Sequence, residues 1–394
     1  MALPLPLATP AGAALLAALD AAAGTTRLVG GAVRDGLLGL PVKDLDLATR
    51  LPPDAVMQRL AAAGLKAVPT GLAHGTVTAV GEGLIAEITT LRRDVHSDGR
   101  HAQVAFTADW QADATRRDFT INALYAGLPD GAILDLTGGL ADLAARRVRF
   151  IGDPLARIAE DHLRILRFFR FSARYAAAID DEGLAACAAR ANDLMALSRE
   201  RIASELQGLL LVADPVPVLG VMIEAGIWRA VLPELAATRL PALARTIAAE
   251  TAAGIAPAWP RRLAALLPAG ATRAAADIGA RLKLANAIRI RLVAAVQAAG
   301  PPPHWATAYS QGAEAVVDRL LIAGDAAAAM PLIGWQRPKL PASGKDIIAR
   351  GVGPGPEVAR RLAAFEGAWV AAGFPADTAS VAALLDAAAQ SSAS

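Results

Sequence analysis

The sequence predicts an α+β protein, in which a small mixed α/β domain is followed by a helical neck, body and tail. Short runs rich in β-branched residues, at 26–29, 77–80 and 84–89, lie in the first quarter of the chain. From about residue 140 onward, apolar residues recur at helical spacing instead. A chain of 394 residues is long enough for two to four domains of about 100–200 residues each.

Four parts are predicted along the chain from changes in composition and from the positions of prolines. The helix candidates after the mixed domain are Leu155 to Tyr175, Asp181 to Ala191 and Arg199 to Leu211. Three consecutive prolines, Pro301 to Pro303, give the clearest linker signal. The predicted parts are a head (1–145), a neck (146–215), a body (216–305) and a tail (306–394).

The composition excludes several classes of protein. Hydrophobic residues make up 54% of the chain, but many are alanines, and no window gives about 18 uninterrupted apolar residues. No membrane span is therefore expected, and the N-terminus lacks the basic region of a signal peptide. The single cysteine, Cys187, rules out an intramolecular disulfide and predicts a reducing, cytoplasmic location. A net charge of +2 does not by itself indicate nucleic-acid binding.

The first element in the head is a strand at Thr26–Val29, which ends at Gly30 and Gly31 before a helix opens at Ala32. Glycines at such a turn let backbone N–H groups approach a ligand closely, and a helix N-terminus favours phosphate. Arg34, on the first helical turn, can donate two hydrogen bonds to phosphate oxygens. Turns of this kind are common in α/β domains, so this one is weak evidence alone.

Two aspartates follow in a β-like run, Asp44-Leu45-Asp46-Leu47. Residues two apart on a strand project from the same face, so the two carboxylates repel each other unless a cation lies between them. Mg²⁺ takes one or two carboxylates together with phosphate oxygens of a substrate. Taken alone, an Asp-x-Asp pair is more often a solvated strand edge.

A second polar cluster is predicted on an amphipathic helix from Asp113 to Tyr125, within the run RRDFTINA at 116–123. Asp118 and Asn122 are four residues apart and share a helical face, with Arg117 beside them. Together these side chains can grip a triphosphate and a ribose hydroxyl. The alternative is a salt-bridged surface helix.

The third cluster, EDHLRILRFFRF at 160–171, is predicted to be one helix with a polar and an apolar stripe. Its charged residues recur every three positions, and eight arginines against three acids lie between residues 144 and 174. The alternative is a solvated arginine-rich face. The residues of the polar stripe are Asp161, Arg164, Arg167 and Arg170.

The glycine turn GGAVRD at 30–35, followed by Asp44-Leu45-Asp46, resembles the signature of class II nucleotidyltransferases. This family contains the bacterial and eukaryotic tRNA CCA-adding enzymes and the bacterial poly(A) polymerases. RRDFTINA is similar to the family's second motif, and the run at 160–171 is similar to its base-reading motif, EDxxRxLRxxRF. The segment SRERI at 198–202 resembles the family's neck helix.

The resemblance implies a role for each residue. Asp44 and Asp46 would hold two metal ions, Mg²⁺, that activate the 3′-hydroxyl of an RNA and stabilise the departing pyrophosphate. Glu87 is the candidate for the family's third carboxylate. Gly31, Arg34 and Arg117 would hold the triphosphate, and Arg167 and Arg170 would address phosphates or stack on the base. The implied partners are tRNA, CTP and ATP, and the sequence points to no protein partner.

The choice of base follows from hydrogen-bonding patterns. Cytosine and adenine both present an amino donor beside a ring-nitrogen acceptor, which a carboxylate and a guanidinium complement. Asp161 and Arg164, predicted one helical turn apart, supply both groups. Uracil and guanine present the reverse pattern and would leave buried polar groups unpaired. One protein pocket is therefore expected to select CTP and ATP without a template.

Two features favour CCA addition over poly(A) addition or the partial CC- and A-adding activities, which the head motifs do not separate. Residues 340–356 are similar to the tail of CCA-adding enzymes, and residues 92–101 resemble the flexible loop implied in the switch from CTP to ATP. His96 and His101 are expected to be loop residues rather than metal ligands. A non-catalytic RNA-binding module is the alternative from another class, and the intact Asp44 and Asp46 argue against it.

Overall fold

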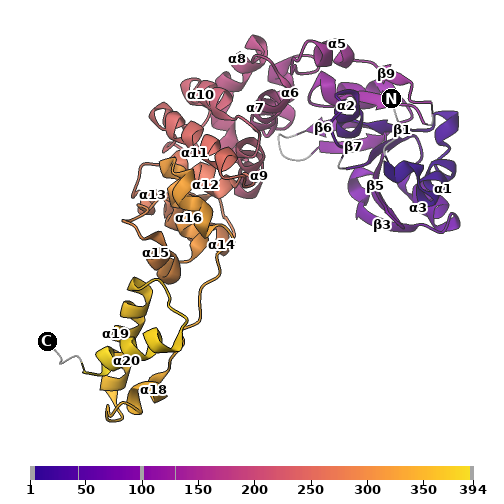
Figure 1. Ribbon diagram of the computed structural model, residues 1–394. Coiled ribbons are helices and arrows are strands. Elements are labelled where there is room, and N and C mark those ends of the chain that lie inside the picture. Colours follow the sequence, from indigo (N-terminus) through magenta and orange to yellow (C-terminus); the bar gives the residue numbers. More distant parts are fainter. Residues whose placement is uncertain (1–4, 43, 98–101, 129, 391–394) are drawn as a thin grey trace. The chain divides into compact units, whose positions relative to one another are not determined.

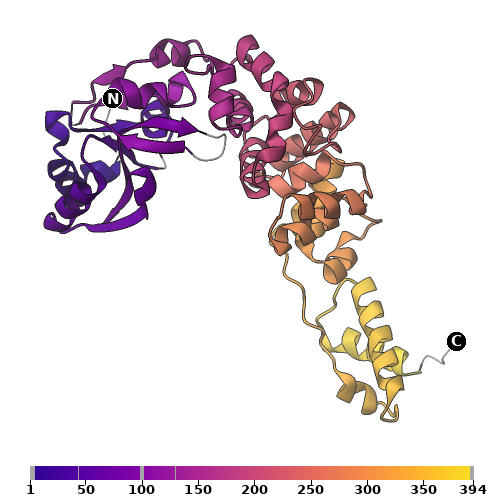
Figure 2. The same ribbon diagram turned by 180° about the vertical axis from the view of Figure 1, so that it is seen from behind.

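The computed structural model describes residues 5–42, 44–97, 102–128 and 130–390 of the chain (Figure 1). The chain divides into two compact units, Met1–Pro233 and Glu234–Ser394. The first unit contains the β-sheets and is drawn from indigo to magenta, and the second consists of helices (Figures 1 and 2). The predicted α+β class, with a mixed head and a helical remainder, is confirmed.

A seven-stranded mixed sheet forms the framework of the first unit. Its strand order is β3-β4-β5-β2-β1-β8-β9, and only β2 and β5 pair in parallel. The parallel register sets Asp46 of β2 directly opposite Glu87 of β5. The strands are β1 (Thr26–Val29), β2 (Asp46–Thr49), β3 (Lys66–Gly71), β4 (Thr76–Gly81), β5 (Leu84–Thr90), β8 (Leu124–Ala126) and β9 (Ile133–Asp135).

Short helices and a separate hairpin complete the head region. Helix α2 (Gly31–Leu37) packs on β1 and β8, and α3 (Pro53–Ala62) packs on β3, β4 and β5. The hairpin pairs β6 (Arg92–Ser97) with β7 (Ala102–Phe106). The other helices here are α1 (Pro10–Ala18), α4 (Trp110–Thr115) and α5 (Gly139–Ala144), and Thr120–Asn122 forms one 3₁₀ turn, η4.

Helices follow the sheet within the same unit, and an aromatic core joins them to it. The ring of Phe119, beside the sheet, lies 5.5 Å from that of Phe171 on α7, and the Phe150 and Phe168 rings stack 5.3 Å apart. Because the rings beside the sheet and the rings on α7 are all buried, the sheet and α7 form one packed core. The helices are α6 (Pro154–Glu160), α7 (Arg164–Tyr175), α8 (Asp181–Ala189), α9 (Arg199–Leu210) and α10 (Val216–Glu224).

Two of the predicted helices are wrong in extent. The helix predicted from Asp113 to Tyr125 ends at Thr115, because the chain then pairs with residues 149–151. Phe119 is extended and forms a β-bridge with Phe150, so its apolar side chain reaches the core from a strand-like segment. Ile121, two residues on, lies in the 3₁₀ turn η4, so this stretch forms no continuous helix.

The helix predicted from Leu155 to Tyr175 is broken into α6 and α7 by residues 161–163. Asp161 is extended, and its Oδ1 accepts a hydrogen bond of 3.1 Å from the backbone N–H of Leu163. A side chain that bonds the backbone two residues on competes with the helix ladder, which explains the break. Asp44 likewise lies in a bend just before β2 rather than on the strand itself.

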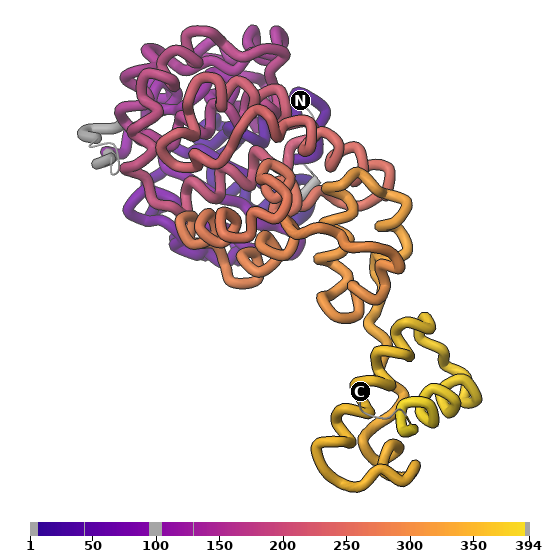
Figure 3. The backbone as a smooth tube through the Cα atoms, turned by 90° about the vertical axis from the view of Figure 1, so that its left-hand side faces the viewer, coloured from indigo at the N-terminus to yellow at the C-terminus, as the bar shows by residue number. Residues whose placement is uncertain are grey.

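The second unit contains two hydrophobic clusters. Residues of α11 (Leu240–Ala252), α15 (His304–Gln311), α16 (Ala313–Ala323) and α17 (Ala326–Ala329) form the first. In Figure 3 the yellow C-terminal helices pack on one another, and their apolar side chains form the second cluster. These helices are α18 (Gly344–Ile348), α19 (Pro356–Ala371) and α20 (Thr378–Gln390), and the remaining ones are α12 (Trp259–Ala265), α13 (Thr272–Arg281) and α14 (Asn286–Ala295).

A buried ionic network joins α11, α12 and α16. The carboxylate of Glu250, 2% exposed, accepts hydrogen bonds from Arg261 and Arg262, each 2.8 Å long. Asp318 accepts a further bond of 2.7 Å from Arg261 and one of 2.7 Å from Arg291. Across the residues that the structure describes, no helix combines the length and the apolar character that crossing a bilayer requires.

Candidate active site

Two neighbouring cavities in the first unit collect the polar side chains singled out in the sequence. The larger cavity has a volume of about 540 Å³ and the smaller one about 200 Å³. Asp46 lines both of them. The larger is also lined by Glu87, Arg117, Asp161, Arg164 and Arg167, and the smaller by Gly31, Arg34, Asp44 and Arg170. Residues that are up to 139 positions apart in the sequence are thus brought together.

The carboxylates form one wall of the site. Asp46 is half-buried, whereas Asp44 is exposed. Burial raises the pKa of Asp46 above its ordinary value, and the negative charges of Glu87 and Asp44 raise it further, although Arg117 opposes this. Glu87 is paired with Asp46 across the strands, and Asp44 lines the smaller cavity together with Asp46. A cation bound among them would remove the repulsion between their negative charges.

The donor set fits a hard divalent cation that also takes ligands from a substrate. Carboxylate oxygens are the ligands that Mg²⁺ prefers, and it commonly uses one or two of them beside water and phosphate. Among the described residues, no group of three or more His, Cys, Asp or Glu side chains forms a complete metal cage. The arrangement around Asp46 therefore suits an ion shared with a phosphate rather than a closed structural site.

The glycine turn lies at the start of α2, as the sequence predicts. Gly30 has a φ of +65°, which a residue with a Cβ atom rarely adopts. Arg34 of α2 is only 5% exposed: its Nε donates to Asp35 over 2.9 Å and its Nη1 to Asn122 over 2.5 Å. Its guanidinium also lies 4.1 Å from the ring centroid of Tyr175 on α7. Two of the three nitrogens of Arg34 are thus engaged within the protein.

Arg117 and its neighbour Arg116, in the turn after α4, both line the larger cavity. Both bind the carboxylate of Asp113, which is 1% exposed. The positive charges of Arg117 and Arg116 hold the pKa of Asp113 well below its usual range despite its burial. Sequence reasoning found Arg117 but missed Asp113, whose only signal was its place three and four residues before the two arginines.

Asp161, in the break between α6 and α7, and Arg164, at the start of α7, both line the larger cavity. Arg164 donates 2.5 Å and 3.0 Å bonds to Oε2 of Glu160 and to the backbone carbonyl of Arg116. Asp161 accepts a 2.8 Å bond from Arg201 of α9 through Oδ2. The two side chains share the cavity although they are not one turn apart on a single helix. Glu160 and Arg201, which orient them, were not singled out in the sequence.

The remaining arginines of α7 are held by acidic partners rather than solvated. Arg167 donates a 2.7 Å bond from Nε to Asp118, whose pKa it lowers although burial acts in the opposite sense. Arg170 donates a 2.5 Å bond to Glu205 of α9. Asn122 also donates a 3.1 Å bond to Asp118. The two predicted neighbours are therefore in contact, although the backbone between them is not an α-helix.

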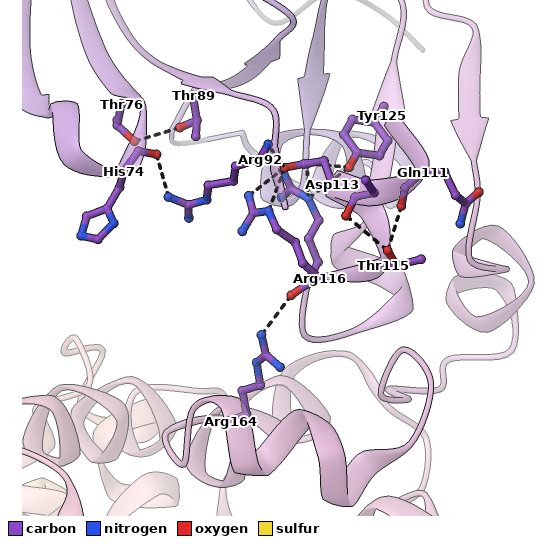
Figure 4. A network of polar contacts seen from close by, with 12 residues as sticks. His74, Thr76, Thr89, Arg92, Gln111, Asp113, Thr115, Arg116, Tyr125 and Arg164 are labelled. Carbon is purple, nitrogen blue, oxygen red and sulfur yellow. Dashed lines mark hydrogen bonds and ion pairs between the residues drawn. The ribbon is translucent and has the colours of Figure 1, made fainter. Parts of the chain in front are cut away.

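The segment at 92–101, expected to be a loop, begins as a strand. Residues Arg92–Ser97 pair with β7, and residues 98–101 lie outside the described residues, as do the side chains of His96 and His101. Arg92, which lines the larger cavity, donates a 2.7 Å bond to the backbone carbonyl of His74 (Figure 4). The base of this hairpin therefore belongs to the site.

Comparison with protein families gives two matches along the first unit. Residues 26–149 match a model described as the poly A polymerase head domain. Residues 178–238 match a model described as a probable RNA and SrmB-binding site of polymerase A. The first match contains Gly31, Asp44, Asp46 and Arg117.

Known proteins with similar sequences carry related names. The chain is 32% identical to the CCA-adding enzyme of Lacticaseibacillus paracasei over 388 residues. The aligned region covers 92% of each chain. It is 44% identical over 205 residues to the mitochondrial CCA tRNA nucleotidyltransferase 1 of Danio rerio, which covers 51% of this chain but only 47% of that protein. A solved structure of the Bacillus stearothermophilus CCA-adding enzyme in complex with CTP is 26% identical, with a TM-score of 0.71 over 96% of this chain and 98% of that one.

Proposed function

Because this chain belongs to the family of CCA-adding nucleotidyltransferases, we propose that it adds two cytidines and one adenosine to the 3′ end of tRNA. In each step the 3′-hydroxyl oxygen of the RNA bonds to the α-phosphorus of CTP or ATP. The bond from that phosphorus to the β-phosphate oxygen breaks, pyrophosphate leaves, and the hydroxyl proton passes to solvent. The RNA grows by one nucleotide without a template.

One observation carries this proposal: carboxylates and guanidinium groups together line a single cavity beside Asp46. Five arginines line the larger cavity, against four acidic residues. Guanidinium groups bind phosphate oxygens in pairs, so this lining suits a nucleoside triphosphate. Positioning and charge stabilisation supply most of the catalysis in phosphoryl transfer, and the cavity offers both.

We propose that Asp44 and Asp46 bind Mg²⁺, with Glu87 as a candidate third carboxylate. Bound there, the ion would supply positive charge to the reacting phosphate and the departing pyrophosphate. The chain's own residues do the rest. Gly31 and Arg34 border the triphosphate on the side of the smaller cavity, Arg117 on the side of the larger one. Arg167 and Arg170 of α7 face the phosphates or the base.

The base is selected, in this proposal, by Asp161 and Arg164. The carboxylate of Asp161 accepts from the amino group of cytosine or adenine, and the guanidinium of Arg164 donates to the ring nitrogen. Arg201 and Glu160 hold the two groups at fixed positions through the bonds described above. Preorganised partners of this kind give large discrimination, because the wrong base leaves buried groups unpaired.

Replacing Asp161 with alanine is expected to reduce the preference for CTP over UTP by about 100-fold or more, since the acceptor for the amino group is lost. Either UTP and GTP become substrates, or CTP and ATP are lost together. The measurement is the kcat/KM of each nucleotide on tRNA that lacks its CCA end. Asp54→Ala, at an exposed aspartate of α3, is the matched control. Unchanged selectivity in Asp161→Ala would refute the assigned role.

We propose that the helices beyond the head bind the tRNA by the shape of its backbone, without reading its sequence. The second family match, at 178–238, supports an RNA-binding role for the region around α8 to α10. The predicted division into head, neck, body and tail carries over to this proposal. We further propose a cytoplasmic location, on the basis of the single, buried Cys187.

The experiment that tests the proposed function is incorporation of labelled CTP and ATP, separately and together, in the presence of Mg²⁺. Its substrates are tRNA without the CCA end, tRNA that ends in CC, and an unstructured RNA. Two cytidines and one adenosine on the truncated tRNA, with little on plain RNA, are the expected result. Long adenosine tracts on any RNA would identify a poly(A) polymerase instead, and cytidine alone or adenosine alone would identify a partial activity.

A further inference from the structure

We infer that Asp113 and Tyr125 are positioning residues, which hold Arg116 and Arg117 so that both face a bound triphosphate. The inference rests on the proposed function and identifies what orients its phosphate-binding arginines. Arg116 and Arg117 line the larger cavity, whereas Asp113 and Tyr125 do not. Any influence of these two residues on a nucleotide therefore passes through the arginines.

A single carboxylate binds both arginines, with one oxygen for each (Figure 4). Oδ1 of Asp113 accepts from Nε and Nη2 of Arg116 over 2.9 Å and 2.8 Å. Oδ2 accepts from Nε and Nη2 of Arg117 over 3.1 Å and 2.9 Å. Each guanidinium is thus fixed by the same edge, and its planar geometry then determines where the remaining nitrogen points.

The remaining nitrogen of Arg117 points toward the glycine turn. A Cβ atom built on Gly30 would lie 3.8 Å from Nη1 of Arg117. Within the described part of the chain, no hydrogen bond to Nη1 of Arg116 or Arg117 is present. The edge bound by Asp113 is neutralised, whereas the free nitrogens stay available for the oxygens of a phosphate.

Tyr125 fixes the carboxylate in turn. Its hydroxyl donates a 2.8 Å bond to Oδ2 of Asp113 and lies 3.2 Å from Nε of Arg117. Tyr125 is fully buried in β8, and its ring meets that of Trp110 on α4 at 5.0 Å in an edge-to-face contact. Asp113 belongs to α4 itself, so a strand and a helix of the rigid framework hold both ends of the contact. Preorganised groups of this kind bind developing charge without the cost of reorientation.

The same network reaches the residue proposed to read the base. The backbone carbonyl of Arg116 accepts the 3.0 Å bond from Nη2 of Arg164 (Figure 4). The turn that carries the phosphate-facing arginines therefore also supports Arg164 at the start of α7. A shift of Arg116 would disturb both, which gives a reason for holding it with a buried carboxylate.

The test is Tyr125→Phe, which removes the hydroxyl and keeps the packed ring. We expect the KM for CTP and for ATP to rise about 10-fold with little change in kcat. The hydrogen bond that holds the Asp113 carboxylate is lost, and the less firmly held arginines then bind the triphosphate less well in the ground state and the transition state alike. Binding of CTP, measured by calorimetry, should weaken by the same factor, whereas binding of cytidine, which has no phosphates, should not change. Asp113→Asn should produce a larger effect in the same direction.

The matched control is Tyr309→Phe, in the second unit, where the hydroxyl donates a 2.7 Å bond to Glu366. It should leave the calorimetric affinity for CTP, measured without tRNA, at its original value. An unchanged KM for CTP in Tyr125→Phe, or equal losses for CTP and cytidine, would overturn the inference while the parent's activity upheld the proposed function. Failure of the parent protein to bind CTP or incorporate it would overturn both.

Discussion

Replacing Asp46 with asparagine is expected to lower the rate of nucleotide incorporation by about 1000-fold or more. Asp46 lines both cavities and pairs directly with Glu87 across β2 and β5. Loss of a metal-binding carboxylate removes several kcal/mol of charge stabilisation from the transition state. Each increase of about 1.4 kcal/mol in the activation free energy lowers the rate tenfold. The measurement is the single-turnover rate of cytidine addition to tRNA without its CCA end. Asp44→Ala is expected to behave in the same way.

Binding of tRNA separates this role from a general loss of structure. The affinity of Asp46→Asn for tRNA should stay close to that of the parent, because the proposed RNA contacts lie mainly beyond the head. Asp54→Asn, at an exposed carboxylate of α3, is the matched control and should retain full activity. Equal loss of incorporation and tRNA binding in Asp46→Asn would show that Asp46 acts through the fold rather than through a metal ion.

Replacing Glu250 with glutamine is expected to destabilise the second unit by about 3–5 kcal/mol, the cost of leaving buried charges without their partner. The side chains of Arg261 and Arg262 are each no more than 5% exposed, so water cannot replace the lost carboxylate. Asp318 still accepts a hydrogen bond from Arg261 after the change. The measurement is the urea unfolding transition, followed by circular dichroism.

The control for Glu250→Gln is Asp277→Asn on α13. Asp277 forms an ion pair of 4.0 Å with Arg273, whose side chain is 97% exposed. Exposed pairs of this kind contribute about 0–1 kcal/mol, so the midpoint of unfolding should hardly change. Equal midpoints for the two variants would contradict the proposed importance of the buried network.

The residues of the candidate site were predicted better than the backbone that presents them. Asp44, Asp46 and Arg117 were found because each lies in a short motif of neighbouring residues. Asp161 was found for the same reason, yet it was assigned to a continuous helix. Its side chain accepts a hydrogen bond from the backbone two residues on, and this bond competes with the helical hydrogen bonds. The spacing of apolar residues gives no sign of that competition.

The partners of these residues were missed for a different reason. Arg201 lies 40 positions from Asp161, and Glu205 lies 35 positions from Arg170. Pairs at such separations meet only because α9 packs on α7, which no local pattern encodes. Asp113 was overlooked because the chain around it was taken for a uniform amphipathic helix. The sequence therefore predicted which chemistry the site contains, and tertiary packing decided how it is held.

The aromatic core that joins the sheet to α7 bears on how this protein could be divided or recombined. Residues 1–145 contain both aspartates and Arg117, but Phe119 packs on Phe171, and Asp118 pairs with Arg167, across that limit. A fragment ending there would expose half a core and an unpaired buried carboxylate. The head-domain match ends at residue 149, before α7, but the packed core continues into α7. A chimaera between relatives must therefore exchange the head and α7 together.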